Sequence, residues 1–208
     1  MNIVQLRQYL DEPDTAGPLL DALYLKETAT GHANLRRMAE GGVTLDLLAN
    51  LCDQFATVAP ALADADMAWN NLERFVLASR NPLATVALFE RDPEALGRLL
   101  QILSTSQYLS DLLVLDSEGY DLLRMTEGHP VARDLLIEEL VAEVMSTPSA
   151  DDAMAALRRF KRRETLRIAY GDIVRNQPIK VVSRQISFVA DAAVEGALCF
   201  FFFQAEDG

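Results

Sequence analysis

Apolar residues recur at spacings of three and four positions along almost the whole chain, and strand-like alternation of apolar and polar positions is hard to find. A clear example is the stripe of Leu48, Cys52 and Phe55. It follows Thr44, a residue type that favours a helix start. The pattern predicts an all-α fold, an irregular multi-helix bundle of about ten helices joined by short loops. Because no period is constant along the chain, a regular repeat array is excluded.

Proline residues mark helix starts and the main internal break. The Asp-Pro-Glu sequence that begins at Asp92 is typical of an N-cap, a first helical position and an acidic first turn that interacts favourably with the helix dipole. The clearest break is the turn at Pro148. We therefore expect an N-terminal helical region over residues 1–146 and two long helices over residues 147–198.

The last residues depart from this helical pattern. Residues 200–203 are four consecutive phenylalanines, and a helix with this run exposes aromatic surface on every side. The string also resembles a translated sequencing-adapter sequence. We therefore expect residues 199–208 to be a non-native tail that does not pack against the core. The alternative, a genuine hydrophobic anchor, is too short to span a bilayer.

Composition and charge narrow the class of protein. Hydrophobic residues make up 50% of the chain and charged residues 24%, which supports a substantial buried core. The formal net charge of −12 argues against a nucleic-acid partner and opposes binding to anionic membranes. The N-terminus does not resemble a signal peptide, and no apolar run approaches the roughly 20 residues of a membrane span. Since Cys52 and Cys199 lack CxxC spacing, we expect neither a disulfide framework nor a zinc site, and a cytoplasmic location.

One segment of this acidic chain is strongly basic and is the candidate functional surface. It places six cations within ten residues: Arg158, Arg159, Lys161, Arg162, Arg163 and Arg167. Ten residues make nearly three helical turns, so these side chains cannot share one face. One interpretation is a solvated basic helix neutralised by neighbours such as Glu138, Glu139 and Glu143. The other is a surface that docks an acidic partner or faces a phosphate-bearing ligand, since arginine binds carboxylate and phosphate through two bonds.

Catalytic and metal-binding patterns are otherwise scarce. The pair Asp64 and Asp66 opens a predicted helix, where acidic residues are expected in any case, and the same holds for Asp151 and Asp152. The two histidines stand alone in turn-like contexts, without a carboxylate or cysteine at ligand spacing. No phosphate-binding glycine loop is present. The sequence therefore predicts no catalytic, cofactor-binding or metal-binding residues in this chain.

Three segments together resemble the glutamine synthetase adenylyltransferase family. Residues 157–164 are similar to the family's LRRFKRRE signature, which continues through residues 165–169. Residues 70–75 resemble its NNLERF segment, and residues 103–112 resemble a turn and helix of the family. The likeness covers about residues 64–198, whereas residues 1–60 match only in being helical.

This resemblance implies a bacterial enzyme that attaches AMP from ATP to a tyrosine of glutamine synthetase and removes it by phosphorolysis. It implies control by a PII signalling protein, with ATP and Mg²⁺ used by the full-length enzyme. In the family this helical region precedes and packs against a nucleotidyltransferase domain, whose metal-binding carboxylates are missing here. We therefore expect no ATP or Mg²⁺ binding by this chain alone. In the full-length enzyme we expect its basic helix to line or brace the nucleotide site. The alternative is a non-catalytic helical module that binds a partner protein.

Overall fold

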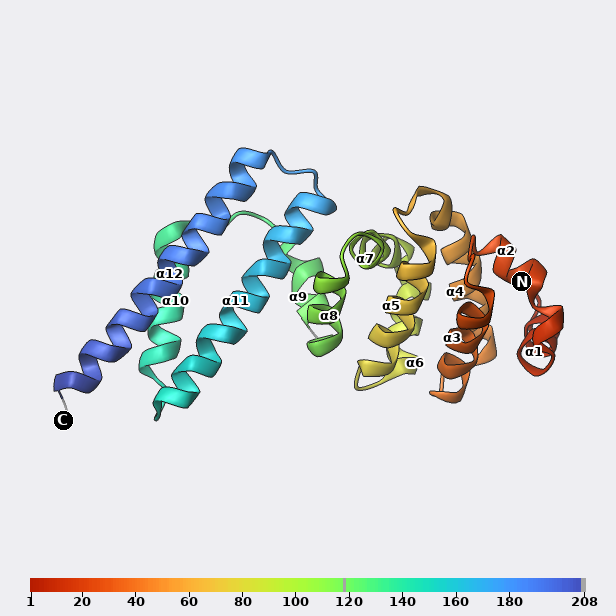
Figure 1. Cartoon of the computed structure of the whole chain (residues 1–208), viewed down its shortest axis with the longest axis horizontal. Coiled ribbons are helices and arrows are strands. Elements are labelled where there is room, and N and C mark those ends of the chain that lie inside the picture. Colours follow the sequence, from red (N-terminus) through yellow and green to blue (C-terminus); the bar gives the residue numbers. More distant parts are fainter. Residues whose placement is uncertain (118, 207–208) are drawn as a thin grey trace. The chain divides into compact units, whose positions relative to one another are not determined.

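The computed structural model describes residues 1–117 and 119–206 (Figure 1). These residues form twelve α-helices joined by short turns and contain no strand. The all-α fold class predicted from the spacing of apolar residues is therefore confirmed. The chain divides into two compact units, Met1–Tyr120 and Asp121–Gly208.

The first unit is a packed set of eight α-helices within its described residues, with short 3₁₀ turns after the first and the fourth. In chain order they are α1 Ile3–Asp11, α2 Gly17–Ala22, α3 Thr28–Glu40, α4 Leu45–Val58, α5 Ala65–Ala78, α6 Pro82–Arg91, α7 Pro93–Thr105 and α8 Gln107–Leu115. Helix α5 contacts α3, α7 and α8, so it lies at the centre of this unit.

Aromatic side chains of α4 and α5 form the middle of the core of the first unit. The buried ring of Trp69 meets Phe55 edge-on, with 4.8 Å between the ring centroids. The indole N–H of Trp69 donates to the carbonyl oxygen of Gly31 at 3.0 Å. One helical turn and a half further on, Phe75 meets Tyr120 in the same way at 5.8 Å. Trp69 and Phe75 thus lie on the buried face of α5, together with Leu72 and Val76.

Side-chain caps fix several helix starts. Asp92 accepts a hydrogen bond from the backbone N–H of Ala95 at 3.1 Å, with Pro93 at the first position of α7. Thr44 occupies the N-cap of α4, although its side chain makes no capping hydrogen bond. Such starts are readable from the sequence because each cap joins neighbours along the chain.

The second unit is built on three mutually packed helices, α10 Arg133–Met145, α11 Ala150–Ile173 and α12 Ile179–Glu206 (Figure 1). The short helix α9 Gly119–Thr126 begins at the unit boundary and leads into them. Arg133 donates to Asp191 at 2.6 Å, and further along both helices Gly196 lies against Leu140. Helices α10 and α12 therefore run parallel to each other. Helix α11, which lies between them in the sequence, runs in the opposite direction.

The core of the second unit draws on all three of these helices. Its buried residues are Leu136, Leu140, Val144, Ala153, Ala156, Phe160, Ala192 and Phe200. This grouping differs from the expected division after residue 146, because the compact units divide after Tyr120 and α10 belongs with α11 and α12. The turn at Pro148 breaks a helix, but the core continues across it.

The phenylalanine run continues α12. The helix extends to Glu206, and Phe200 is only 7% exposed and packs in the core of the second unit. Phe201 and Phe202 are exposed. The expectation that no part of residues 199–208 packs against the core is therefore wrong at Phe200, because one position in each helical turn faces inward. The non-native origin of this segment stays a prediction, and residues 207 and 208 lie outside the described residues.

A buried ion pair lies where α11 meets the connection between α9 and α10. Arg167 and Glu164 are 5% and 3% exposed, and the Nε atom of Arg167 donates to Oε2 of Glu164 at 2.7 Å. The guanidinium also donates from Nη1 to the carbonyl oxygen of His129 at 2.7 Å and from Nη2 to Oε1 of Gln185 at 2.8 Å. One side chain thus joins the α9–α10 connection, α11 and α12.

Gln185 of α12 completes this arrangement. Its Oε1 accepts from the backbone N–H of Val131 at 3.0 Å, and its Nε2 donates to the carbonyl oxygen of Val131 at 2.9 Å. We call the side chains of Glu164, Arg167 and Gln185, with the backbone of His129 and Val131, the Arg167 network. Because its polar groups satisfy one another, it avoids the cost of burying an unbonded charge.

Gly128 brings the α9–α10 connection close to α11. Its φ is +65°, a left-handed conformation that favours glycine. A Cβ atom here would stand 2.6 Å from the backbone nitrogen of Gly171 and 2.9 Å from the carbonyl oxygen of Arg167. Glycine is therefore required at position 128 for two independent reasons, and the close approach puts His129 within reach of the Arg167 side chain.

The first prediction concerns the buried pair. Glu164→Gln leaves the Arg167 guanidinium buried without its counter-charge, and we expect the free energy of unfolding to fall by about 3 kcal/mol. Urea titration followed by circular dichroism measures this quantity. The matched control is Glu143→Gln, since Glu143 also pairs with an arginine of α11, Arg159, but at an exposed site where the loss is about 0.5 kcal/mol. Equal losses would show that burial adds nothing to the Glu164 pair.

The second prediction concerns the phenylalanine run. Phe200→Ala removes a buried ring near a helix end, and we expect the free energy of unfolding to fall by roughly 2–3 kcal/mol. Phe201→Ala, at the neighbouring exposed position, is the control and should change it by less than about 0.5 kcal/mol. Thermal melts of both proteins provide the comparison. A Phe200→Ala protein as stable as the parent would mean that this segment does not pack in solution.

Candidate functional site

The structure sorts the six predicted cations by what each one contacts. Arg159 and Arg163 lie toward α10: Nη2 of Arg159 is 2.9 Å from Oε1 of Glu143, and Nη1 of Arg163 is 2.8 Å from Oε1 of Glu139. Of the three expected carboxylate neighbours, Glu139 and Glu143 therefore pair with the basic helix, whereas Glu138 makes no ion pair within the described part of the chain.

Arg163 is held by more than one group. Its Nε atom is 3.1 Å from Oε1 of Glu164, and its guanidinium lies over the Phe160 ring, 5.3 Å from the centroid. Burial alone lowers the pKa of Arg163, but attraction to the carboxylates of Glu139 and Glu164 outweighs it, so the pKa is raised. The side chain is charged and engaged within the unit, and this favours a structural role.

Arg167 is not on the surface. The sequence placed it among the candidate surface cations, but it faces inward one turn after Glu164 and is bonded within the Arg167 network. The whole side chain packs inward. Its charge is therefore unavailable to a ligand on the surface.

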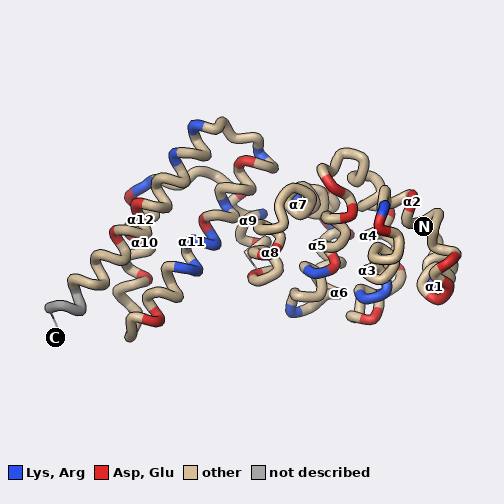
Figure 2. The backbone as a smooth tube through the Cα atoms, viewed as in Figure 1, with Lys and Arg blue, Asp and Glu red and all other residues tan. Residues whose placement is uncertain are grey.

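Arg158, Lys161 and Arg162 form the remaining open group, which we call the open cations. Arg158 and Lys161 are exposed and Arg162 is half-buried. Within the described part of the chain none of them makes an ion pair or a side-chain hydrogen bond. Figure 2 shows the basic stretch in the middle of α11, after an acidic first turn. Neighbouring carboxylates therefore pair with Arg159 and Arg163, as the first interpretation expects, whereas docking of a partner or a ligand by the open cations stays a prediction.

An apolar groove of about 580 Å³ lies beside the open cations, between α11 and α12. Its lining includes Lys161, Ile168 and Asp172 of α11, and Val182, Val189 and Ala193 of α12. The spacing within each set is seven and then four residues, so each set is one face of a helix. Sequence reasoning missed this groove, although a second apolar stripe on each long helix, beside the core stripe, was the available signal.

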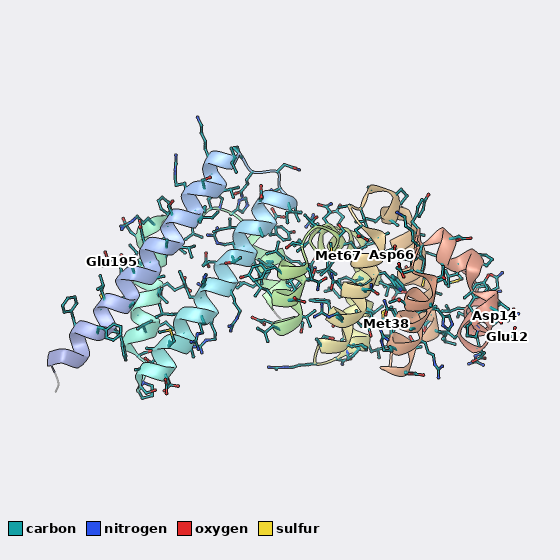
Figure 3. All side chains as sticks on the ribbon, in the orientation of Figure 1. Glu12, Asp14, Met38, Asp66, Met67 and Glu195 are labelled. Carbon is teal, nitrogen blue, oxygen red and sulfur yellow. The ribbon has the colours of Figure 1, made fainter. Side chains whose placement is uncertain are left out.

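The paired aspartates are taken up by helix starts, as predicted. Asp64 accepts from the N–H of Met67 at 2.9 Å and caps α5. Asp66, labelled in Figure 3 beside Met67, accepts from the backbone N–H groups of Lys26 and Glu27 at 3.1 and 2.9 Å. It thereby ties the segment before α3 to α5. Its carboxylate already has backbone donors, which suits a structural role.

The second pair, Asp151 and Asp152, lies in the first turn of α11 behind the N-cap Ser149. The hydroxyl of Ser149 donates to Oδ2 of Asp152 at 2.6 Å and accepts from its backbone N–H at 3.2 Å. No group of three or more His, Cys, Asp or Glu residues is arranged to hold a metal ion among the described residues.

The two histidines differ from each other. His129 is exposed in the α9–α10 connection, as expected. His32 was expected in a loop or cap but is buried within α3, with Nε2 2.8 Å from the carbonyl oxygen of Tyr9. The expectation for His32 is wrong because α3 continues past Gly31, where the absent Cβ leaves room for Leu25. Neither histidine belongs to a group of three or more potential metal-binding side chains in the described residues.

Helix α12 has the length and composition of a membrane span over Ile179–Phe202, with a mean hydropathy of 1.4 and 28% of the most apolar window buried. The expectation that no apolar run approaches this length is therefore wrong. One such helix does not distinguish a span from a packed helix. Here Gln185 bonds to Val131 and Asp191 pairs with Arg133, so α12 is bound along one side to the start of α10.

Comparison with known proteins identifies a family. The model of the glutamate-ammonia ligase adenylyltransferase family matches residues 96–207. The bifunctional glutamine synthetase adenylyltransferase/adenylyl-removing enzyme of Leifsonia xyli subsp. xyli is 36% identical over 105 residues, 50% of this chain and 10% of that protein. The enzyme of the same description from Rhodopseudomonas palustris strain TIE-1 is 34% identical over 125 residues, 60% of this chain and 12% of that protein.

The chain therefore spans roughly a tenth of the length of the curated relatives it matches. The matched segment contains both long helices of the second unit, including the basic residues that carry the resemblance seen in the sequence. It makes up more than half of the chain. The chain belongs to the glutamate-ammonia ligase adenylyltransferase family.

Proposed function

We propose that this chain is a helical, non-catalytic part of an enzyme that transfers AMP from ATP to a tyrosine of glutamine synthetase and removes it by phosphorolysis. The observation that carries the proposal is the family match over residues 96–207, since the matched relatives are described as bifunctional glutamine synthetase adenylyltransferases/adenylyl-removing enzymes. The reaction would regulate nitrogen assimilation.

The chemistry of nucleotidyl transfer indicates which part of the enzyme binds ATP and Mg²⁺. Transfer of a nucleotidyl group uses Mg²⁺ held against the phosphates by converging carboxylates. The carboxylates of Asp64 and Asp66 instead accept hydrogen bonds from backbone N–H groups, and that of Asp152 accepts from the hydroxyl of the N-cap Ser149. We therefore assign ATP and Mg²⁺ binding to parts of the enzyme outside these 208 residues. The role of this chain is to support the catalytic domain, with the basic helix bracing the nucleotide site.

The partners follow from the same family assignment. Glutamine synthetase is the protein substrate, and a PII signalling protein is the regulator that we propose. The net charge of −12 is our reason to propose no nucleic-acid or membrane partner, and a cytoplasmic location fits this set of partners.

A second candidate is a non-catalytic helical module that binds a partner protein. It is favoured by the position of the open cations, which lie beside an apolar groove and make no ion pair in the described residues. The two candidates differ in whether this chain contributes to AMP transfer.

A segment exchange tests the first candidate. The counterpart of residues 121–206 in the Rhodopseudomonas palustris enzyme is replaced by this compact unit, and AMP transfer from labelled ATP to glutamine synthetase is measured. We expect transfer of the same order as in the parent enzyme, because the unit would restore the support for the catalytic domain. The 208-residue chain alone should label no glutamine synthetase.

The control is the same chimera carrying Glu164→Gln, which should lose activity and thermal stability together, since it weakens the Arg167 network. A chimera that is folded by circular dichroism but inactive would contradict the supporting role. Labelling of glutamine synthetase by the isolated chain would contradict the assignment of the chemistry elsewhere.

A further inference from the structure

On α11, the groove between α11 and α12 lies on a different face from the core that this helix shares with α10. On α11 the core positions Ala156 and Phe160 face α10, whereas Ile168 and Asp172 line the groove. At 100° per residue, the two sets are separated by about a third of a turn around the helix. The described residues of α11 and α12 therefore leave the surface between these two helices open on this side.

The shape of this surface fits a helix. Its lining follows the same spacing on α11 and on α12, as in ridges and grooves that receive a further helix. Small side chains, among them Ala169, Ala190 and Ala193, allow the backbone of an incoming helix to approach closely. Ile186 contributes a large exposed apolar side chain, 56% exposed. An amphipathic helix that inserts its apolar stripe buries these groups.

The charges at the rim select the partner. Lys161 lies in the lining, and Arg158 and Arg162 stand within one turn of it. Against these three cations stands Asp172 in the lining. The groove is thus rimmed by a cationic excess in a chain of net charge −12.

We propose that this groove binds an amphipathic helix of a separate partner protein, with an apolar stripe flanked by Asp and Glu residues. A second copy of this chain fits less well, because a symmetric contact brings two sets of open cations into one interface. An anionic bilayer is disfavoured by the overall negative charge. The proposal does not depend on a role in AMP transfer.

A designed peptide tests the proposal on the 208-residue chain. The probe is a fluorescently labelled 18-residue helix, about five turns long, with Leu and Ala on one face and Glu on both flanks. A control peptide has the same apolar face and Lys in place of every Glu. We expect fluorescence anisotropy to show saturable binding of the Glu peptide, at least about tenfold tighter than the Lys peptide.

Matched variants locate the site. Ala190→Glu places a carboxylate in the groove and should abolish binding, whereas Leu135→Glu, at an exposed apolar position on α10 outside the lining, should leave it unchanged. Lys161→Gln should weaken binding severalfold, whereas Arg159→Gln removes a cation already paired with Glu143 and should have little effect. Circular dichroism confirms that each variant is folded.

Several outcomes overturn the proposal. If the Glu peptide does not bind, the groove is not a helix-binding site. If both peptides bind equally well, the open cations do not select an acidic partner. Sedimentation velocity that finds a dimer abolished by Ala190→Glu assigns the groove to a second copy. Displacement of the Glu peptide by vesicles of phosphatidylcholine and phosphatidylglycerol assigns it to a lipid surface.

Discussion

The buried charge of Arg167 constrains the second unit more than any other group. A guanidinium removed from water is tolerated only when a counter-charge and several acceptors surround it. Here Glu164 supplies the charge, and His129 and Gln185 supply acceptors from two other segments. Because Gln185 is held in turn by both backbone polar groups of Val131, the connection before α10 has a defined path across α11 and α12. The close approach at Gly128 depends on the same path.

Much of this fold was predictable because its signals are local. The cap at Asp92 and the apolar stripe of α4 involve residues within a few positions of each other, so the sequence displays them directly. Contacts between distant segments were not readable in this way. Nothing near position 167 shows that His129 and Gln185 will accept from its guanidinium. Arg167 therefore looked like one more surface cation.

The candidate site was predicted in part for the same reason. The basic segment is visible in the sequence, as is its resemblance to the family that the comparisons identify. Which of its cations are paired and which are open depends on α10, because Glu139 and Glu143 of that helix neutralise Arg163 and Arg159. The phenylalanine run illustrates the converse: its composition is unusual, yet Phe200 falls on the inward side of a continuing helix and packs like any core residue. Tertiary position, more than residue type, decides what each of these side chains does.

Neighbouring residues on α11 connect the ion pair to the groove. Arg167 points into its network, and Ile168, the next residue, lines the groove on another side of the helix. A rotation of α11 that reshaped the groove would also pull the guanidinium away from its acceptors on two other segments, the α9–α10 connection and α12. The groove walls are therefore preorganised, and a helix that docks there loses little free energy to ordering its receptor.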